Sequence, residues 1–286
     1  MAVNKQQVWF ITGCSKGLGR DIAEAALAKG CKVVATARRK QELDDLVAEF
    51  PDMAMALGVD VKNDGQISDA VSQAVAKFGT IDVLINNAGH GLLGAIEEVS
   101  DAEARALFDV NVFGLLAVTR AILPVMRKQN SGHIINMSSI SGLVANPGAG
   151  LYGASKHAVE AISEALLKEL APFGINVSVV EPGPVRTDFA GGSMMLAEQI
   201  ADYKDTPAHM LRQHVTAFSG KQPGDPLKVA QAVINIAGSD APPFHLVLGT
   251  GAFEGVRNKL ENFAKELETW EEVSRGIDYP GESFKF

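Results

Sequence analysis

The stretch VWFITGCSKGLG, residues 8–19, decides the fold of this chain of 286 residues. Its first five residues are mostly apolar or β-branched, which predicts a buried strand. Three glycines follow, and a helical pattern then runs to about residue 29. Glycines at such a strand–helix junction permit a tight turn and the close approach of a pyrophosphate, which the free N–H groups of the helix attract. The spacing differs from G-x-G-x-x-G, but its position favours a nucleotide site over a turn without a ligand.

The rest of the chain alternates short apolar runs with longer helical patterns. Predicted strands cover residues 8–12, 32–37, a run ending at 60, 83–86, 134–137, 176–180 and 245–248. Predicted helices cover, after the first, residues 41–50, 64–78, 101–129, 151–171 and 253–275. Strands that are apolar throughout are buried on both faces. The pattern predicts an α/β, Rossmann-type doubly wound fold, with a seven-stranded, mostly parallel sheet and helices on both faces.

Two regions interrupt this alternation. Residues 188–225 are rich in Gly, Met and Pro and have no clean period, which is typical of a lid over a binding site. Residues 253–286 form a C-terminal extension that is helical to about residue 275. Because no repeat and no linker occur, the sequence predicts one dinucleotide-binding and catalytic domain over residues 1–286, with a lid and an extension.

Composition limits the possible partners. The net charge is −8 and no basic run occurs, which argues against nucleic acid. The longest apolar region, residues 106–126, is broken by Asp109, Asn111 and Arg120, so we expect no membrane span. The chain has only two cysteines, and its N-terminus has no apolar signal core. These features favour a cytoplasmic protein.

The remaining titratable residues give no further site. The six histidines do not pair with acids at metal-ligand spacing, so no metal is expected. The acidic pairs Glu97-Glu98 and Glu271-Glu272 are interpreted as solvated surface.

The residues at the end of the second predicted strand indicate whether the site prefers NAD or NADP. A carboxylate there would bind the ribose 2′-hydroxyl of NAD, but this chain has Arg38 and Arg39. Together with Lys16 in the glycine turn, they suit the 2′-phosphate of NADP. The alternative is a solvated arginine pair that begins a helix, although arginine there opposes the helix dipole. The residues favour NADP over NAD.

Tyr152 and Lys156 are the strongest candidates for chemistry. On a helix, four residues make about one turn, so the phenol and the ammonium share a face. A neighbouring ammonium stabilises the phenolate, which makes the tyrosine a usable proton donor near neutral pH. Ser138 and Ser139 follow a predicted strand at the sheet edge where open α/β sheets bind ligands, and strand parity leaves both open. Asn111 interrupts an apolar helix and needs hydrogen-bond partners.

Taken together, these motifs resemble the short-chain dehydrogenase/reductase family in its compact single-domain branch. The resemblance runs from about residue 8 to residue 187, and it rests on Thr12-Gly13-x-x-x-Gly17-x-Gly19, Asn86-Asn87-Ala88-Gly89, Asn111, Ser139, Tyr152-x-x-x-Lys156 and Pro182-Gly183. It implies that Tyr152 protonates the substrate carbonyl oxygen, that Lys156 lowers the pKa of Tyr152, and that Ser139 holds that oxygen. Asn111 would kink its helix and hold a water that relays protons to Lys156.

The resemblance also implies which residues bind the cofactor. They are Gly13, Ser15, Lys16, Gly17, Leu18, Gly19, Arg38, Arg39, Asp60, Val61, Asn87, Ala88, Gly89, Tyr152, Lys156, Pro182, Gly183, Val185 and Thr187. The substrate pocket is expected to include Ser139, Leu143, Asn146, Tyr152, Gly183 and Met194. Because this lining is apolar and flexible, it suits a small hydrophobic ketone, aldehyde or secondary alcohol.

Other functions remain open at this point. The Thr-Gly-Cys-Ser turn is locally similar to 17β-hydroxysteroid and retinol dehydrogenases, so a steroid or retinoid alcohol dehydrogenase is one alternative. A nucleotide-sugar epimerase would need a larger C-terminal domain. A non-catalytic NADP(H)-sensing regulator would be expected to lack Tyr152, Lys156 or Ser139, and all three are present. The family implies a homodimer or homotetramer that assembles through the helices at 101–129 and 151–171.

Overall fold

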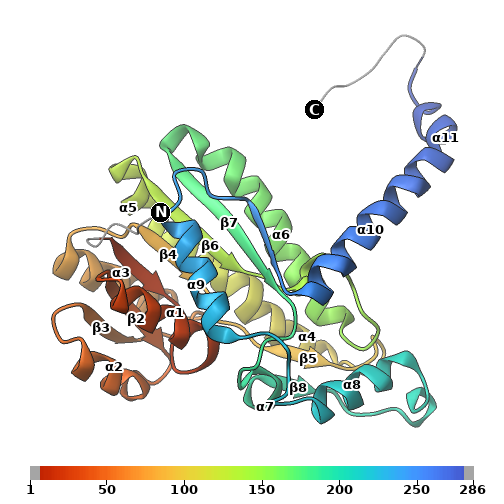
Figure 1. Cartoon of the computed structure of the whole chain (residues 1–286), viewed down its shortest axis with the longest axis horizontal. Coiled ribbons are helices and arrows are strands. Elements are labelled where there is room, and N and C mark those ends of the chain that lie inside the picture. The colour runs from red at the N-terminus through yellow and green to blue at the C-terminus, as the bar shows by residue number, and fades with distance from the viewer. Residues whose placement is uncertain (1–6, 280–286) are drawn as a thin grey trace.

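A seven-stranded sheet organises the computed structural model, which describes residues 7–279 (Figure 1). The strand order is β3-β2-β1-β4-β6-β7-β9, and every pairing is parallel. The strands are β1 Val8–Ile11, β2 Lys32–Ala37, β3 Ala54–Gly58, β4 Val83–Asn86, β6 Gly132–Met137, β7 Ile175–Pro182 and β9 His245–Leu248. The chain winds outward from β1 to β3 and then returns to β4 beside β1. This reversal is the switch point at which such sheets bind ligands, and the predicted fold class is confirmed.

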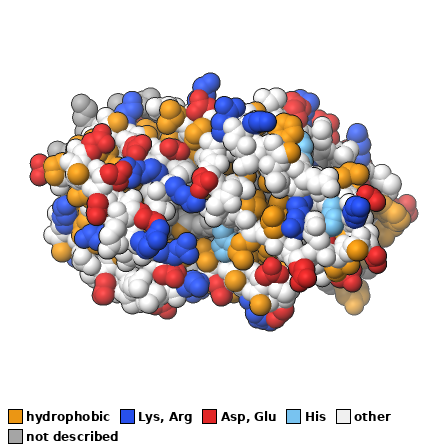
Figure 2. All heavy atoms as spheres, turned by 90° about the horizontal axis from the view of Figure 1, so that it is seen from below, with side chains coloured by type: hydrophobic (Ala, Val, Ile, Leu, Met, Phe, Trp, Pro, Cys, Tyr) orange, Lys and Arg blue, Asp and Glu red, His pale blue; other side chains and the backbone are white. Residues whose placement is uncertain are grey.

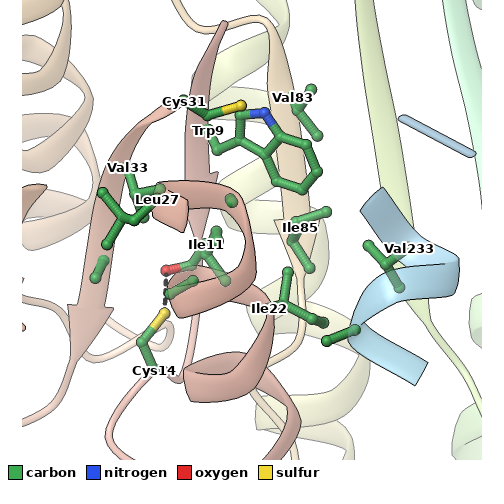
Figure 3. Packing of buried hydrophobic residues seen from close by; sticks show 14 of the residues in the cluster. Trp9, Ile11, Cys14, Ile22, Leu27, Cys31, Val33, Val83, Ile85 and Val233 are labelled. Carbon is green, nitrogen blue, oxygen red and sulfur yellow. Dashed lines mark hydrogen bonds between the residues drawn. The ribbon is translucent and has the colours of Figure 1, made fainter. Parts of the chain in front are cut away.

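Helices cover both faces of the sheet. The core on one face joins the sheet to α1 Gly17–Ala28, α2 Asp44–Glu49 and α9 Pro226–Ala237. On the other face lie α3 Asp64–Phe78, α5 Leu115–Gln129 and α6 Gly150–Leu170. Trp9 and Ile11 of β1 point into the first core with Val233 of α9 (Figure 3), whereas Val8 and Phe10 point into the second. Because successive side chains alternate between two buried faces, the whole strand is apolar.

The predicted helix at 101–129 is continuous but irregular. It consists of α4 Asp101–Phe108, a π-helical segment η2 Asp109–Gly114, and α5. A capping box between Ser100 and Glu103 fixes its start. The helix is long and apolar enough to cross a membrane by length and composition alone. However, Val118, Ile122 and Met126 on one side of it pack into the core against the sheet, as in the core helix of a globular domain.

The region at 188–225 folds into short elements beneath the carboxyl edge of the sheet (Figure 1). They are α7 Phe189–Gly192, β8 Met194–Leu196, η5 Ala201–Tyr203 and α8 Pro207–Ala217. Strand β8 pairs in parallel with β5 Gly91–Leu93, which follows β4. The sequence did not predict these elements. Three of them, α7, β8 and η5, have only three or four residues and cannot show a period, and β8 depends on a partner about one hundred residues away. Helix α9 also has no counterpart among the predicted elements.

The remaining elements are short turns and the C-terminal helices. They are η1 Lys40–Leu43, η3 Ile140–Gly142, η4 Ala171–Phe173, α10 Thr250–Thr269 and α11 Glu271–Arg275. The predicted helix at 41–50 is therefore a 3-10 turn followed by the short helix α2. Helices α10 and α11 extend away from the body (Figure 1). Residues 280–286 of the predicted extension lie outside the described residues.

Candidate active site

A cleft of about 1890 Å³ opens along the carboxyl edge of the sheet. It is lined by the glycine turn, by the ends of β2, β3, β4, β6 and β7, and by the segment at 188–225. Pockets for one small molecule usually measure roughly 300–1,000 Å³, so this cleft has room for a dinucleotide and a second molecule. Figure 2, the view from below, shows Lys and Arg side chains gathered on one part of this face, and hydrophobic and histidine side chains near its middle.

The glycine turn fits an anionic ligand. Gly13 and Gly17 have φ angles of +72° and +62°, which side-chain-bearing residues rarely adopt. A Cβ atom on Gly13 would lie 3.0 Å from the Cα of Ala88, so the turn can approach β4 only without one. Helix α1 has no side-chain cap and no acidic residue in its first turn. Its first N–H groups are therefore open to a phosphate.

Asn87 joins the glycine turn to the end of β4. Its side-chain amide donates to the main-chain oxygens of Thr12 at 2.9 Å and Gly13 at 3.0 Å. In return, the Thr12 hydroxyl accepts hydrogen bonds from the main-chain N–H groups of Asn87 and Ala88. Gly19 packs against this joint, since a Cβ there would lie 2.3 Å from the Asn87 amide nitrogen. Asn87 and Ala88 thus line the cleft on a fixed support.

The three expected phosphate-binding cations, Lys16, Arg38 and Arg39, all line the cleft. Lys16 pairs with Asp188 at 2.5 Å, and Arg39 pairs with Glu42. Arg38 is exposed and has no ion pair or side-chain hydrogen bond with the described part of the chain. The linear sequence did not reveal the two carboxylates as partners of Lys16 and Arg39. The convergence of these cations on a 2′-phosphate stays a prediction.

Tyr152, Ser139 and Lys156 meet on one wall of the cleft. Tyr152 and Lys156 lie one turn apart on α6, and both are buried. Burial raises the pKa of Tyr152 to about 12, although a hydrogen bond with Ser139 opposes the rise. Burial lowers the pKa of Lys156 to about 8, against the opposing effect of Glu160. Its ammonium donates to the main-chain oxygen of Met137 at 2.8 Å.

Burial opposes the expected effect of Lys156 on Tyr152. It is the largest effect on the pKa of Tyr152 in this structure and raises it, whereas Lys156 was expected to lower it. The effect of Lys156 on this pKa stays a prediction. The ammonium lies 6.0 Å from the centre of the tyrosine ring and is turned towards Met137. At neutral pH, Tyr152 is therefore a neutral phenol with a proton to give.

Ser138 and Ser139 have different neighbours in the structure. Ser139 is the one that hydrogen-bonds the Tyr152 phenol, which agrees with its selection. Ser138 also lines the cleft, but its side chain lies beside Glu160 and lowers the pKa of that carboxyl.

Asn111 does not line the cleft. It is buried in the π-helical segment, where the expected helix irregularity is found. Its amide oxygen accepts from the N–H of His90, and its nitrogen donates to the His90 oxygen and to the Ser155 hydroxyl. These bonds hold the turn after β4 against α6, so Asn111 positions the chain around the site. The water relay stays a prediction.

Most of the other predicted residues line the cleft. They are Ser15, Leu18, Asp60, Val61, Gly89, Asn146, Pro182, Gly183, Val185, Thr187 and Met194. Gly19 and Leu143 do not. Leu143 directly follows η3, and its main-chain oxygen accepts a hydrogen bond from Lys259 of α10. The cleft also includes Lys62 and His90, which the predicted site did not include. Burial and then the charges of Arg38, Lys156 and Lys62 lower the pKa of His90, so positive potential spans the cleft.

One predicted surface residue is in fact buried. Glu98 accepts hydrogen bonds from the N–H groups of Ala95 at 2.8 Å and Ile200 at 3.0 Å, and it pairs with buried His209 at 2.7 Å. Burial raises the pKa of Glu98, but these bonds outweigh it and the net pKa is lowered. The interpretation of Glu98 as solvated is wrong, because two of its partners, Ile200 and His209, come from the segment at 188–225, over a hundred residues away. This pair fastens that segment to the body.

Two buried glutamates and an exposed histidine form a cluster behind the catalytic wall. Ligand atoms of Glu160, Glu181 and His245 lie within 4.8 Å of one another. Glu160 is one turn beyond Lys156 on α6, while the other two come from β7 and β9. Burial raises the pKa of each glutamate to about 7. Sequence spacing could not reveal this group, because its members come from three separate elements.

Known proteins are similar to this chain along most of its length. A model of short chain dehydrogenases matches residues 7–194. A 3-ketodihydrosphingosine reductase from Bacteroides thetaiotaomicron is 37% identical over 245 residues, which are 85% of this chain and 88% of that protein. A short-chain dehydrogenase structure from Streptomyces avermitilis has a TM-score of 0.90 and 43% identity, and covers 96% of this chain and 100% of its own. A short chain dehydrogenase/reductase from Burkholderia phymatum, solved in complex with NAD, has a TM-score of 0.81, covers 100% of both chains, and at 24% identity shows the fold alone.

Proposed function

The chain belongs to the short-chain dehydrogenase family, and we propose that it is an NADP(H)-dependent oxidoreductase that reduces a hydrophobic ketone or aldehyde. In the reverse direction it oxidises a secondary alcohol. The observation that carries this proposal is the meeting of Tyr152, Ser139 and Lys156 on one wall of a cleft whose other end is a phosphate-binding glycine turn.

The proposed chemistry divides between the cofactor and the protein. When bound, the nicotinamide ring supplies hydride to the carbonyl carbon. The Ser139 hydroxyl donates a hydrogen bond to the carbonyl oxygen and stabilises the negative charge that develops on it. Tyr152 transfers its proton to that oxygen, which becomes the alcohol hydroxyl. The positive charge of Lys156 stabilises the phenolate that remains, and the phenolate then regains a proton from solvent.

NADP is preferred to NAD because of Arg38. It stands directly after β2, where a carboxylate would otherwise repel the 2′-phosphate, and its guanidinium can hold a phosphate through paired hydrogen bonds. Lys16 and Arg39 assist only after leaving Asp188 and Glu42. Asp60, Val61 and Asn87 are proposed to surround the adenosine, and Val185 and Thr187 the nicotinamide carboxamide.

The proposed substrate is hydrophobic because apolar side chains line the cleft beyond Tyr152. Phe189 stands with its ring centre 6.1 Å from that of Tyr152, and Met194, Leu211 and Phe218 line the same region. Asn146 and Gly183 complete the lining. The Bacteroides relative, by its name, reduces 3-ketodihydrosphingosine, a ketone, which supports a ketone substrate here.

We further propose that residues 188–225 act as a lid on a single catalytic domain in the cytoplasm. The chain has only two cysteines, and both are buried, which suits a reducing compartment. A homodimer or homotetramer through α4, α5 and α6 is the proposed assembly. The exposed Phe113 on that surface supports it.

A direct assay tests the function. Purified protein is mixed with NADPH and a panel of apolar ketones and aldehydes, and oxidation of NADPH is followed by absorbance. We expect turnover for at least one compound, and more slowly with NADH. Tight NADPH binding without turnover on any compound, in either direction, would instead indicate the sensing regulator.

A further inference from the structure

The C-terminal helices form an arm that the body of this chain does not cover. Helix α10 is 20 residues long, and Ala252 at its base is its only buried residue. Near the base, Lys259 donates a hydrogen bond to the main-chain oxygen of Leu143, and Gly255 faces Ile140. Beyond residue 260 every described residue of the arm is exposed. An isolated helix in water is stable only when it packs against another surface, so we expect the arm to bind a partner.

The arm carries a regular apolar stripe. Its apolar residues recur at alternating steps of three and four, which are the a and d positions of a heptad repeat. They are Phe253, Val256, Leu260, Phe263, Leu267 and Trp270. Five of them are large and exposed, at 55% for Phe253, 62% for Leu260, 55% for Phe263, 52% for Leu267 and 61% for Trp270. A straight stripe of this period is the seam of a helix pair, not the broad face of a helix on a sheet.

We propose that this stripe, residues 253–270, binds the same stripe of a second copy as an antiparallel two-helix coiled coil. The stripe is symmetric about its middle. When two copies run in opposite directions, Phe253 meets Trp270, Val256 meets Leu267, and Leu260 meets Phe263, so each a position lies against a d position. A surface that fits its own copy in this way is what a two-fold dimer requires.

The size of the stripe also suits a dimer. Its exposed side chains offer roughly 650 Å² per copy, or about 1,300 Å² for the pair, which lies within the range of specific interfaces. An apolar patch of this size is unusual on a monomer. A membrane surface is a poorer partner, since acidic residues outnumber basic ones on the arm and amphipathic membrane helices are usually basic.

The charged residues beside the stripe favour an antiparallel arrangement of the two helices. The flanking e and g positions include Lys259, Glu266 and Glu271. In the antiparallel pair, Lys259 of each copy lies near Glu266 of the other. In a parallel pair, Glu266 would lie opposite Glu271, and like charges would repel. Lys259 can serve both Leu143 and a glutamate, because an ammonium has three donors.

Assembly in solution tests the proposal. The Leu260→Glu/Leu267→Glu variant of the full chain places two charges on the stripe. Its matched control, Asn258→Glu/Asn262→Glu, places the same charges elsewhere on the same helix. Analytical ultracentrifugation should give half the wild-type mass for the stripe variant and the wild-type mass for the control. Equal masses for all three proteins would overturn the proposal. Circular dichroism confirms that each variant is folded.

Disulfide trapping tests the direction. Residues 253 and 270 of one helix are about 26 Å apart, so they cannot join within a chain. Both native cysteines are buried. Under oxidation, Phe253→Cys/Trp270→Cys should form a covalent dimer, and Phe253→Cys alone should not. A dimer from the single variant, or none from the double variant, would overturn the antiparallel pair. Binding to anionic vesicles by a chain that does not self-associate would assign the arm to membranes instead.

Discussion

The ammonium of Lys156 lies 2.8 Å from the main-chain oxygen of Met137, the last residue of strand β6. This bond ties the first half of α6 to the carboxyl edge of the sheet. Tyr152 stands one turn earlier on the same helix, and Ser139 follows β6 by two residues. The relative positions of phenol and serine are therefore fixed by an anchor that also carries charge, so Lys156 has both a structural and an electrostatic part in the site.

Replacing Tyr152 by Phe removes the proposed acid and little else. We expect turnover to fall by about 10³-fold or more, because general acid catalysis contributes roughly 10²–10⁴. Binding of NADPH, measured by fluorescence titration, should stay within about twofold of wild type, since the ring remains. Comparable turnover in Tyr152→Phe and wild type would remove Tyr152 as the acid.

The reduction rate should depend on the protonation of Lys156. Its pKa is lowered to about 8 by burial, so the ammonium is charged at neutral pH and loses its proton as the pH rises through 8. We expect kcat/KM for reduction to be level below that pH and to decline above it. In Lys156→Arg the charge persists, so any remaining activity should not decline in that range. A level wild-type profile up to pH 9.5 would contradict this role.

Arg38 and Arg39 provide a matched pair for testing cofactor choice. Arg39 is held by Glu42, whereas Arg38 faces the cleft without an ionic partner in the described chain. Losing a charge-assisted bond costs about 1.5–3 kcal/mol, so Arg38→Ala should weaken NADPH binding by about 10- to 100-fold and leave NADH binding nearly unchanged. Arg39→Ala should change NADPH binding by less than about threefold. If Arg39→Ala weakened NADPH binding more than Arg38→Ala did, the 2′-phosphate would be bound by Arg39 instead.

The Glu98–His209 pair should hold the lid closed on the body. Glu98→Ala leaves His209 and two N–H groups buried without their acceptor, at a local cost of about 2–4 kcal/mol. Hydrogen exchange followed by mass spectrometry should then show faster exchange across residues 194–217 and unchanged exchange in the sheet. Glu97→Ala is the control, because Glu97 is exposed and its side chain accepts a single hydrogen bond, from the hydroxyl of Tyr203, within residues 7–279. Equal exchange rates in the two variants would show that Glu98 does not keep the lid ordered.

The sequence predicted the parts of this protein that depend on local pattern. Strand β4 and helix α3 were predicted at their observed ends. Local residues mark the ends of α3, because Asn63 caps its first turn and Gly79, in the left-handed conformation, follows its last residue. Tyr152 and Lys156 were placed together because a helix fixes residues four apart. Pairings across the chain were not predictable. Asp188 capturing Lys16, His209 reaching Glu98, and β8 joining β5 each depend on tertiary proximity that no local pattern encodes.

The buried glutamates behind the site should make stability depend on pH. The pKa of Glu160 is raised to about 7 in the folded protein, chiefly by burial, while its unfolded value is near 4.5. The folded state then binds more protons than the unfolded state between these values, so stability falls as the pH rises from 4.5 to 7. The groups that face Glu160 are Ser138, Lys156, Glu181 and His245. Glutamine keeps the shape of the side chain and its place beside Ser138, and it carries no charge.

Glu160→Gln should therefore stabilise the protein at pH 8 by up to about 3 kcal/mol, because a change of one in the pKa corresponds to about 1.4 kcal/mol. At pH 4.5 the gain should vanish, since the glutamate is then protonated when folded. Thermal unfolding of both proteins at the two pH values measures the difference. As a control, Glu164→Gln alters an exposed glutamate one turn further along α6, paired with Lys168, and should give no gain at either pH. A gain in Glu160→Gln that is equal at both pH values would show that repacking, not charge burial, is the cause.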